Sequence, residues 1–342
     1  MRGDGHGFHS AFHAPRQPLF HIYRRPVAGA WRCHNLPIQE AKCDGYPSRL
    51  DLYQPQFTLD VEKKKPDKEK PVTDTSPVAL VLGAIKGIGK DIALSLARSG
   101  IRTVATYHDW QTHLAALKQD LQATGTSHLI VEIDLRKTDQ IADLIEQIIN
   151  RFGRLDFLIN NIERGGWPVV HGPYTQDQWD LEMATTLRAK WWVFNAALPH
   201  LKAAGHGAVI NISSIAGIVG RSGPASFVFN DGYAAANRGI ALLTETWARM
   251  GAPGVRVNEL MLGLIQTRHA EETRGWTLLT NAQKEALAHH TLLGRTGTVD
   301  DVVRAVQFLL FDATFMTGSC LRLDGGYVLG GEPVAPMPPG VV

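Results

Sequence analysis

A tyrosine and a serine in the second half of the chain have the types and the setting for proton transfer. Ser214 ends the polar run Asn211-Ile212-Ser213-Ser214, and Tyr233 follows nineteen residues later at the start of a predicted helix. A phenol can give a proton to a substrate oxygen, and a serine hydroxyl can orient that oxygen. A lone tyrosine at a helix start is normally a packing residue. Its place after a strand that ends in two serines favours the catalytic interpretation.

A glycine-rich segment has the composition of a phosphate-binding turn. Gly83, Gly87 and Gly89 lie in Gly83-Ala-Ile-Lys-Gly-Ile-Gly89, between the apolar run Val78-Ala-Leu-Val-Leu82 and a predicted helix. Glycine permits the tight turn and lets backbone amides reach phosphate oxygens at a helix N-terminus. An ordinary turn between a strand and a helix can contain this string by chance, so the surrounding elements decide its meaning.

Two side chains at strand ends add to this predicted site. Asp134 ends the third predicted strand, where its carboxylate could accept a hydrogen bond from an adenine amino group, and Asn160 ends the fourth. Each of them alone would more often be a helix cap or a turn former. Their position beside the glycine-rich segment favours a dinucleotide crevice.

The elements that must position these residues alternate between strand and helix from Pro77 onward. We expect a capping box at Thr175 and Gln178, and a C-terminal helix cap at Gly100. Strict alternation implies an α/β fold with a doubly wound parallel sheet, Rossmann-like. The predicted strands cover residues 78–82, 103–107, 129–133, 155–160, 208–213 and 255–260, with a last strand near Leu321, and the predicted helices cover the region from Ile92 to Gly100 and residues 110–124, 138–152, 176–201, 233–250 and 299–311.

Composition separates the two ends of the chain from its centre. We predict one dinucleotide-binding catalytic domain over residues 76–331, a disordered extension with a charged linker over residues 1–75, and a Pro-rich tail over residues 332–342. The extension contains five histidines, but they lack the regular spacing of a helix or a hairpin. We therefore favour a disordered arm, or sequence ahead of the true start, over a metal site.

Bulk properties exclude several classes of protein. The net charge of +2 and the pI near 8.4 give no case for nucleic acid or membrane surfaces as partners. No segment has the eighteen or so apolar residues of a membrane span, and the N-terminus lacks the layout of a signal peptide. Three cysteines make no disulfide framework and match no zinc pattern. We expect a cytoplasmic protein without a metal.

Taken together, the motifs resemble the short-chain dehydrogenase/reductase family over residues 76–331. The matching pieces follow the family order: Gly83-x3-Gly87-Ile88-Gly89, Asp134-Leu135, Asn160-Asn161, Asn211-Ile212-Ser213-Ser214, Tyr233-Ala-Ala-Ala, Arg256-Val257-Asn258 and Asp324-Gly325-Gly326. The resemblance implies that Tyr233 exchanges a proton with the substrate oxygen while hydride moves to or from a nicotinamide, and that Ser214 orients this oxygen. It also implies a set of cofactor-binding residues: Gly83, Ile85, Lys86, Gly87, Ile88, Gly89, Asp134, Leu135, Asn160, Asn161, Tyr233, Asn237 and Thr267.

The resemblance favours NADP(H) over NAD(H), although NAD(H) is possible. Lys86 stands where basic residues of the family often meet the extra phosphate of NADP. The second predicted strand ends Thr106-Tyr107-His108, without an immediate carboxylate to bind a bare 2′-hydroxyl. The alternative is that Lys86 is a solvated loop lysine.

Five positions depart from the family pattern. Asn237 replaces the lysine of Tyr-x-x-x-Lys, and Thr186 aligns with the helix asparagine that supports a proton-relay water. The Asn-Asn-Ala-Gly motif becomes Asn160-Asn161-Ile162-Glu163, and Leu82 stands for the usual threonine. We predict that Ser214, Tyr233, Asn237 and Thr186 form the catalytic set, with Asn237 as a ribose ligand. Without the lysine, we expect Tyr233 to titrate nearer about 10, which favours reduction because the neutral phenol is abundant.

Three further features have two interpretations each. The segment Ile215–Gly232 is longer than the family interval, and we expect an enlarged loop near the substrate. Lys190 shares a helical face with Thr186 and could reach the site, but we favour a surface or subunit-contact lysine beside Trp191 and Trp192. The tryptophan pair indicates either a helix interface of a homodimer or homotetramer, or burial in the monomer core.

The leading functional prediction is an NADP(H)-dependent oxidoreductase that reduces a carbonyl group of a small or medium substrate. The alternative is a catalytically impaired, nucleotide-binding pseudo-enzyme that acts as a sensor or interaction protein, which the changes at Asn237 and Thr186 motivate. A non-redox activity on the same scaffold is weaker, because no additional acid/base pair is evident. The region Gly263–Leu293, where the family builds its substrate lid, does not select a substrate class.

Overall fold

The computed structural model describes residues 75–163, 175–267, 279–331 and 334–340. Within them, parallel strands form one sheet in the order β3-β2-β1-β4-β5-β6-β9. The strand order reverses between β1 and β4, and helices follow the strands, so the predicted doubly wound Rossmann-like fold is confirmed.

The strands of this sheet are short and mostly apolar, because helices cover both faces. They are β1 (Val78–Val81), β2 (Arg102–Tyr107), β3 (His128–Glu132), β4 (Phe157–Asn160), β5 (Gly207–Ser214), β6 (Val255–Leu262) and β9 (Cys320–Leu323). A separate two-stranded pair joins β7 (Ile265–Gln266) and β8 (Gly297–Thr298). The helices are α1 (Gly87–Arg98), α2 (Leu114–Ala123), α3 (Gln140–Phe152), α4 (Gln176–Glu182), α5 (Ala189–Ala204), α6 (Ala216–Val219), α7 (Asp231–Gly251), α8 (Asn281–His290) and α9 (Val299–Gln307). Shorter or wider turns are η1 (Gln111–His113), η2 (Met183–Arg188), η3 (Gly223–Phe227), η5 (Phe308–Asp312) and η6 (Tyr327–Leu329).

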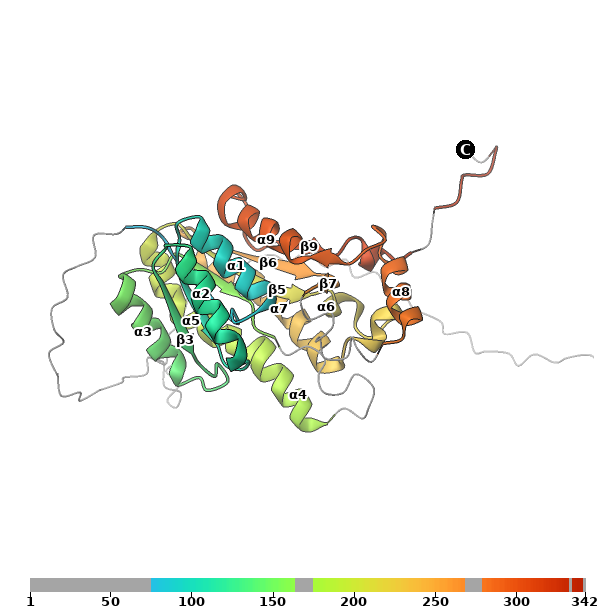
Figure 1. Cartoon of the computed structure of the whole chain (residues 1–342). Helices are drawn as coiled ribbons and strands as arrows, with labels where there is room; N and C mark the ends of the chain where they lie inside the picture. The colour runs from blue at the N-terminus through green and yellow to red at the C-terminus, as the bar shows by residue number, and fades with distance from the viewer. Residues whose placement is uncertain (1–74, 164–174, 268–278, 332–333, 341–342) are drawn as a thin grey trace, which may run out of the picture. The chain divides into compact units, whose positions relative to one another are not determined.

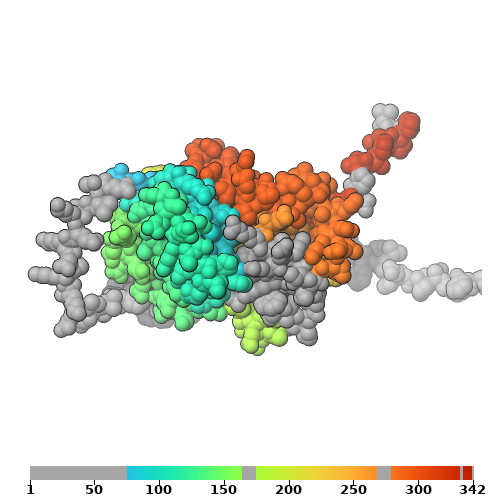
Figure 2. All heavy atoms as spheres, viewed as in Figure 1, coloured from blue at the N-terminus to red at the C-terminus, as the bar shows by residue number. Residues whose placement is uncertain are grey.

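Two apolar cores lie on the two faces of the sheet. One joins α1, α2 and α9 to the side chains of alternate strand residues such as Val81 and Ile210. The other joins α3, α5 and α7 to the intervening residues, among them Leu80 and Val209. In Figure 1, α1 and α9 lie in front of the sheet, and Figure 2 shows the side chains of α2 and α9 at the surface of this face. The layers leave the carboxyl ends of the strands as the edge where a site can form.

The predicted helix over residues 176–201 is α4 and α5 joined by a π-helical segment, η2. Its start has the predicted capping box, in which Thr175 and Gln178 each bond the other's backbone. The predicted cap at Gly100 also holds, since this residue has a φ of +80° and follows the end of α1. The π segment itself was not predicted. Such segments are frequent at functional sites, and this one lies directly before the residues that reach the sheet from α5.

The segment Ile215–Gly232, where we expected an enlarged loop near the substrate, contains regular structure. It contains the short helix α6 and the 3-10 turn η3, and several of its residues join a third apolar cluster with Tyr233. Ala225 donates its backbone N–H to the Tyr327 hydroxyl at 2.7 Å. The longer interval between Ser214 and Tyr233 is therefore packed structure that holds the start of α7.

The predicted extension lies outside the described residues, apart from Thr75. The first two described residues are hydrogen-bonded to the domain. Arg154 donates to the Thr75 carbonyl at 3.2 Å, and Arg102 donates to the Ser76 carbonyl at 3.0 Å. None of the helices within the described residues is both long and apolar enough to cross a membrane. The domain limits stay a prediction.

Candidate active site

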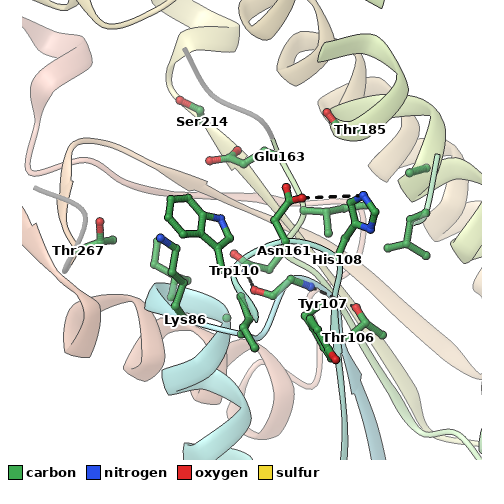
Figure 3. Close-up of a pocket in the computed structure, with 18 of the residues that line it drawn as sticks. Lys86, Thr106, Tyr107, His108, Trp110, Asn161, Glu163, Thr185, Ser214 and Thr267 are labelled. Atoms are coloured by element: carbon green, nitrogen blue, oxygen red, sulfur yellow. Dashed lines mark hydrogen bonds and ion pairs between the residues drawn. The ribbon is translucent and has the colours of Figure 1, made fainter. Parts of the chain in front are cut away.

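A cavity of about 450 Å³ lies at the carboxyl ends of the strands. The loops after β1, β2, β3, β4 and β6 and the last residues of β5 contribute to its wall, together with Tyr233 from the first turn of α7 and one residue each from η2 and α5. Figure 3 shows Ser214 and Glu163 toward one end of the cavity, and Lys86, Trp110 and His108 toward the other. The position at the reversal of strand order is the general ligand site of such sheets.

The glycine-rich turn forms a close cradle at the start of α1. A Cβ on Gly89 would lie 2.2 Å from the Gly83 carbonyl oxygen and 2.5 Å from Nδ2 of Asn161. Gly83 has a φ of +65°, a left-handed conformation that glycine adopts without strain. No side chain caps the helix start at Lys86, and the first turn holds no acidic residue. These backbone amides and the positive end of the helix dipole fit the pyrophosphate of a dinucleotide.

Charged and aromatic side chains gather at the other end of the cavity. Arg136 donates to the Asp134 carboxylate from Nε at 2.7 Å and from Nη2 at 2.8 Å. These hydrogen bonds are the main reason why the pKa of Asp134 falls to about 2. The Lys86 ammonium lies over the Trp110 ring, 2.9 Å from its centroid. Asp134 is thus held by Arg136, and an adenine would meet a carboxylate that already has a partner.

Tyr233 lies at the start of α7 because a neighbouring side chain fixes that start. Asn230 caps the helix, and its Oδ1 accepts the Tyr233 N–H at 2.7 Å. The phenol donates to Oε2 of Glu163 at 2.9 Å. Burial, followed by the charge of Glu163, raises the pKa of Tyr233 well above its ordinary value, while the Ser214 hydroxyl lowers it. The phenol is therefore neutral over a wider pH range than the sequence led us to expect.

Asn237 lies one turn after Tyr233 and is fully buried. Its Oδ1 accepts the Ser214 N–H at 3.0 Å, and its Nδ2 donates to the Tyr233 carbonyl at 3.0 Å. Both ends of the amide are thus engaged by backbone, and Asn237 is not part of the cavity wall. The contact with a ribose that we predicted has no support in this geometry. What the amide does here is to link the end of β5 to the first turn of α7.

Lys190 is not a surface or subunit-contact lysine, and that interpretation was wrong. The residue is fully buried, and its ammonium donates to the Ile212 carbonyl at 2.6 Å. The charges of Glu163 and Glu259 act on it and raise its pKa, but burial is the larger effect, so that the pKa falls to about 8. The sequence held a signal for this burial: Lys190, Phe194 and Ala197 are spaced as one helical stripe, and all three are buried.

The structure brings most of the predicted site residues to one cavity. Its wall includes Gly83, Ile85, Lys86, Ile88, Gly89, Asp134, Leu135, Asn161, Ser214, Tyr233 and Thr267. Four predicted residues are not part of the wall, namely Gly87, Asn160, Thr186 and Asn237. Asn160 instead donates to Oδ1 of Asn211 at 2.7 Å, below the cavity floor. Within the described residues, the buried Thr186 hydroxyl has no hydrogen-bond partner.

Two acidic residues of the site were not predicted from the sequence. Glu163 appeared there only as a departure from the family motif, and a loop residue has no periodicity that indicates its direction. Glu259 is almost fully buried within β6 and accepts a hydrogen bond from the Ser213 hydroxyl. The sequence did contain a signal for Glu259, because a charged residue inside a predicted buried strand requires a polar partner.

Comparisons with known proteins agree with this geometry. Residues 83–328 match the family model described as enoyl-(acyl carrier protein) reductase. The 3-oxoacyl-[acyl-carrier-protein] reductase FabG of Staphylococcus aureus (strain Mu50) is 29% identical over 252 residues, which cover 72% of this chain and 96% of that protein. The 3-oxoacyl-[acyl-carrier-protein] reductase of Synechocystis is 30% identical over 258 residues, which cover 75% of this chain and 98% of the relative. A crystal structure assigned as a short-chain alcohol dehydrogenase from Sinorhizobium meliloti 1021 matches with a TM-score of 0.66 at 27% identity, over 76% of this chain and 100% of that one.

Proposed function

The chain belongs to the short-chain dehydrogenase/reductase family of oxidoreductases, which act on carbonyl and alcohol groups with NAD(P)(H), and on that premise we propose that it reduces a carbonyl compound of small or medium size with NADPH. The observation that carries the proposal is the Tyr233 phenol on the wall of a cavity whose other end has a glycine cradle. Burial raises the pKa of this phenol well above its ordinary value, which favours the neutral form. A neutral phenol is the protonation state that reduction consumes.

Each end of the cavity has its own task in this proposal. The amides at the start of α1 hold the pyrophosphate, and Asn161 supports them by donating to the Gly83 carbonyl at 3.3 Å. When bound, the reduced nicotinamide supplies the hydride. Ser214 orients the substrate carbonyl, and the Tyr233 hydroxyl gives its proton to the oxygen as negative charge develops there. Asn237 keeps Ser214 and Tyr233 in register through its two backbone contacts.

The preference for NADPH rests on Lys86. Its side chain is part of the cavity wall, and the loop after β2 brings Trp110 beside it. A cation in this place favours the extra phosphate of NADPH, because hydrogen bonds between charged groups are stronger than those between neutral ones. The only acidic residue of that loop in the wall, Asp109, follows β2 by two positions and not directly.

A titration followed by turnover tests the function. We expect cofactor fluorescence to report tighter binding of NADPH than of NADH, and a panel of ketones, aldehydes and 3-oxoacyl thioesters to contain a substrate. Tyr233→Phe should keep NADPH binding and lose about 100-fold or more in reduction rate, as removal of a general acid does. NADPH binding without reduction of any carbonyl would instead favour a nucleotide-binding sensor. Absence of binding would contradict both functions.

We also propose that the protein is cytoplasmic and forms a homodimer or homotetramer through the outer face of α5. Trp191 and Trp192 are 38% and 43% exposed, so burial in the monomer core does not explain the pair. Trp191 also lines a surface groove with Leu187 and Leu243. An aromatic pair beside an apolar groove suits the buried centre of a subunit interface.

A further inference from the structure

Three charged residues influence one another electrostatically near the start of α5. Glu259 lies in β6 and is 1% exposed, Lys190 comes down from α5 and is 0% exposed, and Glu163 follows β4. The charges of both glutamates act on Lys190. A buried charge is costly unless another charge or a hydrogen bond compensates it, so Lys190 and Glu259 depend on charged neighbours. The more exposed Glu163 belongs to the same system through its charge on Lys190.

One member of this system touches the reacting group. Oε2 of Glu163 lies 2.9 Å from the Tyr233 hydroxyl, which is within the range for direct proton transfer. Glu163 also lines the cavity, and its side chain remains accessible to water there even though protein surrounds the cavity. The residue can therefore exchange protons with the phenol on one side and with solvent on the other.

We propose that Glu163 returns the proton to Tyr233 after each reduction, and that the charge of Lys190 balances this carboxyl group in place of the lysine missing at position 237. The inference rests on the proposed reductase function and adds to it the route by which the phenol is restored. Glu163 is the catalytic residue of this route because it touches the phenol. Lys190 acts through Glu163 and is a positioning residue.

The proton balance of the step is simple. The substrate oxygen takes the phenolic proton of Tyr233 while the carbonyl carbon takes the hydride, which leaves a phenolate. The protonated carboxyl group of Glu163 then gives its proton to that phenolate and becomes a carboxylate. Water in the cavity returns a proton to the carboxylate, so that one turnover consumes one proton from solvent.

The electrostatic surroundings favour the protonated form that this step needs. Desolvation by the surrounding protein atoms raises the pKa of Glu163, whereas the Lys190 charge and the Tyr233 hydroxyl lower it, and the net direction is upward. Burial, the largest cause, raises the pKa of Tyr233, whose donor role is therefore not lost at moderately alkaline pH. Burial raises the pKa of Glu259 in β6, whereas the charges of Lys190 and of Arg238 on α7 lower it.

The sign of the pH dependence follows from these shifts. A group whose pKa is raised holds its proton up to a higher pH than usual, and loses it as the pH rises through the raised value. We expect the rate of carbonyl reduction to be constant at acidic pH and to fall tenfold per pH unit above the pKa of Glu163. Glu163→Gln keeps the shape and the hydrogen bond but has no proton to give. This variant should lose about 100-fold on the acidic plateau, and the alkaline fall should disappear.

Variants of Lys190 provide a second test, the pH at which the reduction rate falls, which a purely structural role of this residue would not change. Because its charge lowers the pKa of Glu163, Lys190→Met should shift the alkaline fall to higher pH, and Lys190→Arg should leave it near the wild-type value. Matched controls are Glu245→Gln on α7, the helix of Tyr233, and Lys202→Met on α5, the helix of Lys190. Both residues are exposed. Both controls should keep the wild-type pH profile.

A measurement on the free protein separates this inference from the proposed function. In protein with isotope-labelled glutamate, the carboxyl resonance that is lost in Glu163→Gln should titrate above the ordinary glutamate range, and higher still in Lys190→Met. An active wild type whose alkaline fall survives in Glu163→Gln, or a Glu163 resonance that ignores Lys190→Met, would overturn the inference alone. A wild type that binds NADPH but reduces no carbonyl would overturn the proposed function, and the proton route with it.

Discussion

Asn237 shows that a residue can replace a catalytic lysine and take over a different task. Its amide joins the Ser214 N–H to the Tyr233 carbonyl, both at 3.0 Å, in a fully buried place. Asn237→Lys would restore the family motif but would remove both contacts and bring a second cation near Lys190. Loss of a buried hydrogen bond costs about 1–3 kcal/mol.

We therefore expect Asn237→Lys to reduce the rate of carbonyl reduction about tenfold or more and to lower the midpoint of thermal unfolding. Steady-state kinetics and a thermal melt of the same preparation measure the two effects. A gain in rate with an unchanged melt would mean that the site is a decayed copy of the family site, and that Lys190 does not replace the missing lysine.

Lys86 allows a second test at the scale of one residue. Lys86→Met removes the cation but keeps an apolar chain against Trp110. Since a hydrogen bond to a charged group contributes about 1.5–3 kcal/mol, NADPH should bind at least about tenfold more weakly, whereas NADH should bind as before. Fluorescence titration of both cofactors measures this, with the exposed Lys118→Met on α2 as control. Equal losses for both cofactors would show that Lys86 does not contact the extra phosphate.

The site residues that could be predicted from the sequence are those that belong to a local motif. Tyr233 and Ser214 were found from the motif around each of them, and the glycine turn from its place between strand and helix. Glu163 was not found, because its contact with Tyr233 joins residues 70 apart in the chain. No local pattern specifies a side-chain contact over that separation.

At the scale of elements, the strands were predictable because buried parallel strands are short apolar runs. The π-helical segment η2 could not be predicted. It is only six residues long, and over that length a π-helix and an α-helix give the same pattern of apolar residues. The effect is local but matters for the site, since Thr186 lies inside η2 and Lys190 follows it by two residues. Helix existence could be predicted here, and helix register could not.

The contact between α6 and α7 gives a prediction about an element. A Cβ on Gly217 would lie 2.9 Å from the Arg238 nitrogen and 3.0 Å from the Asn237 carbonyl carbon, and both are backbone atoms. Gly217→Ala should therefore push α7 outward and destabilise the protein by about 1–3 kcal/mol, more than the gain of at most about 1 kcal/mol in helix propensity. The displaced helix should also slow reduction.

Urea unfolding measures this change in the free energy of unfolding. Gly254→Ala is the matched control, because the nearest contact of its new Cβ would be the Gly205 carbonyl oxygen at an ordinary 3.8 Å. A Gly217→Ala protein as stable as the control would mean that α6 can move away from α7 without cost, and that it does not hold the start of α7.

For the whole molecule, we predict that the outer face of α5 is a subunit interface. The Trp191 and Trp192 rings stand edge to face with centroids 4.9 Å apart, and both remain partly exposed. Burial of apolar surface stabilises a complex by about 25 cal/mol per Å². A second copy of the chain that covers the two rings would therefore be favoured over their contact with water. We expect light scattering to show a dimer or tetramer for the wild type and for Trp191→Phe/Trp192→Phe, which keeps an aromatic face, but a smaller species for Trp191→Arg/Trp192→Arg. The same mass for all three proteins would place the subunit contact elsewhere, and a monomeric wild type would leave this aromatic pair to a different partner.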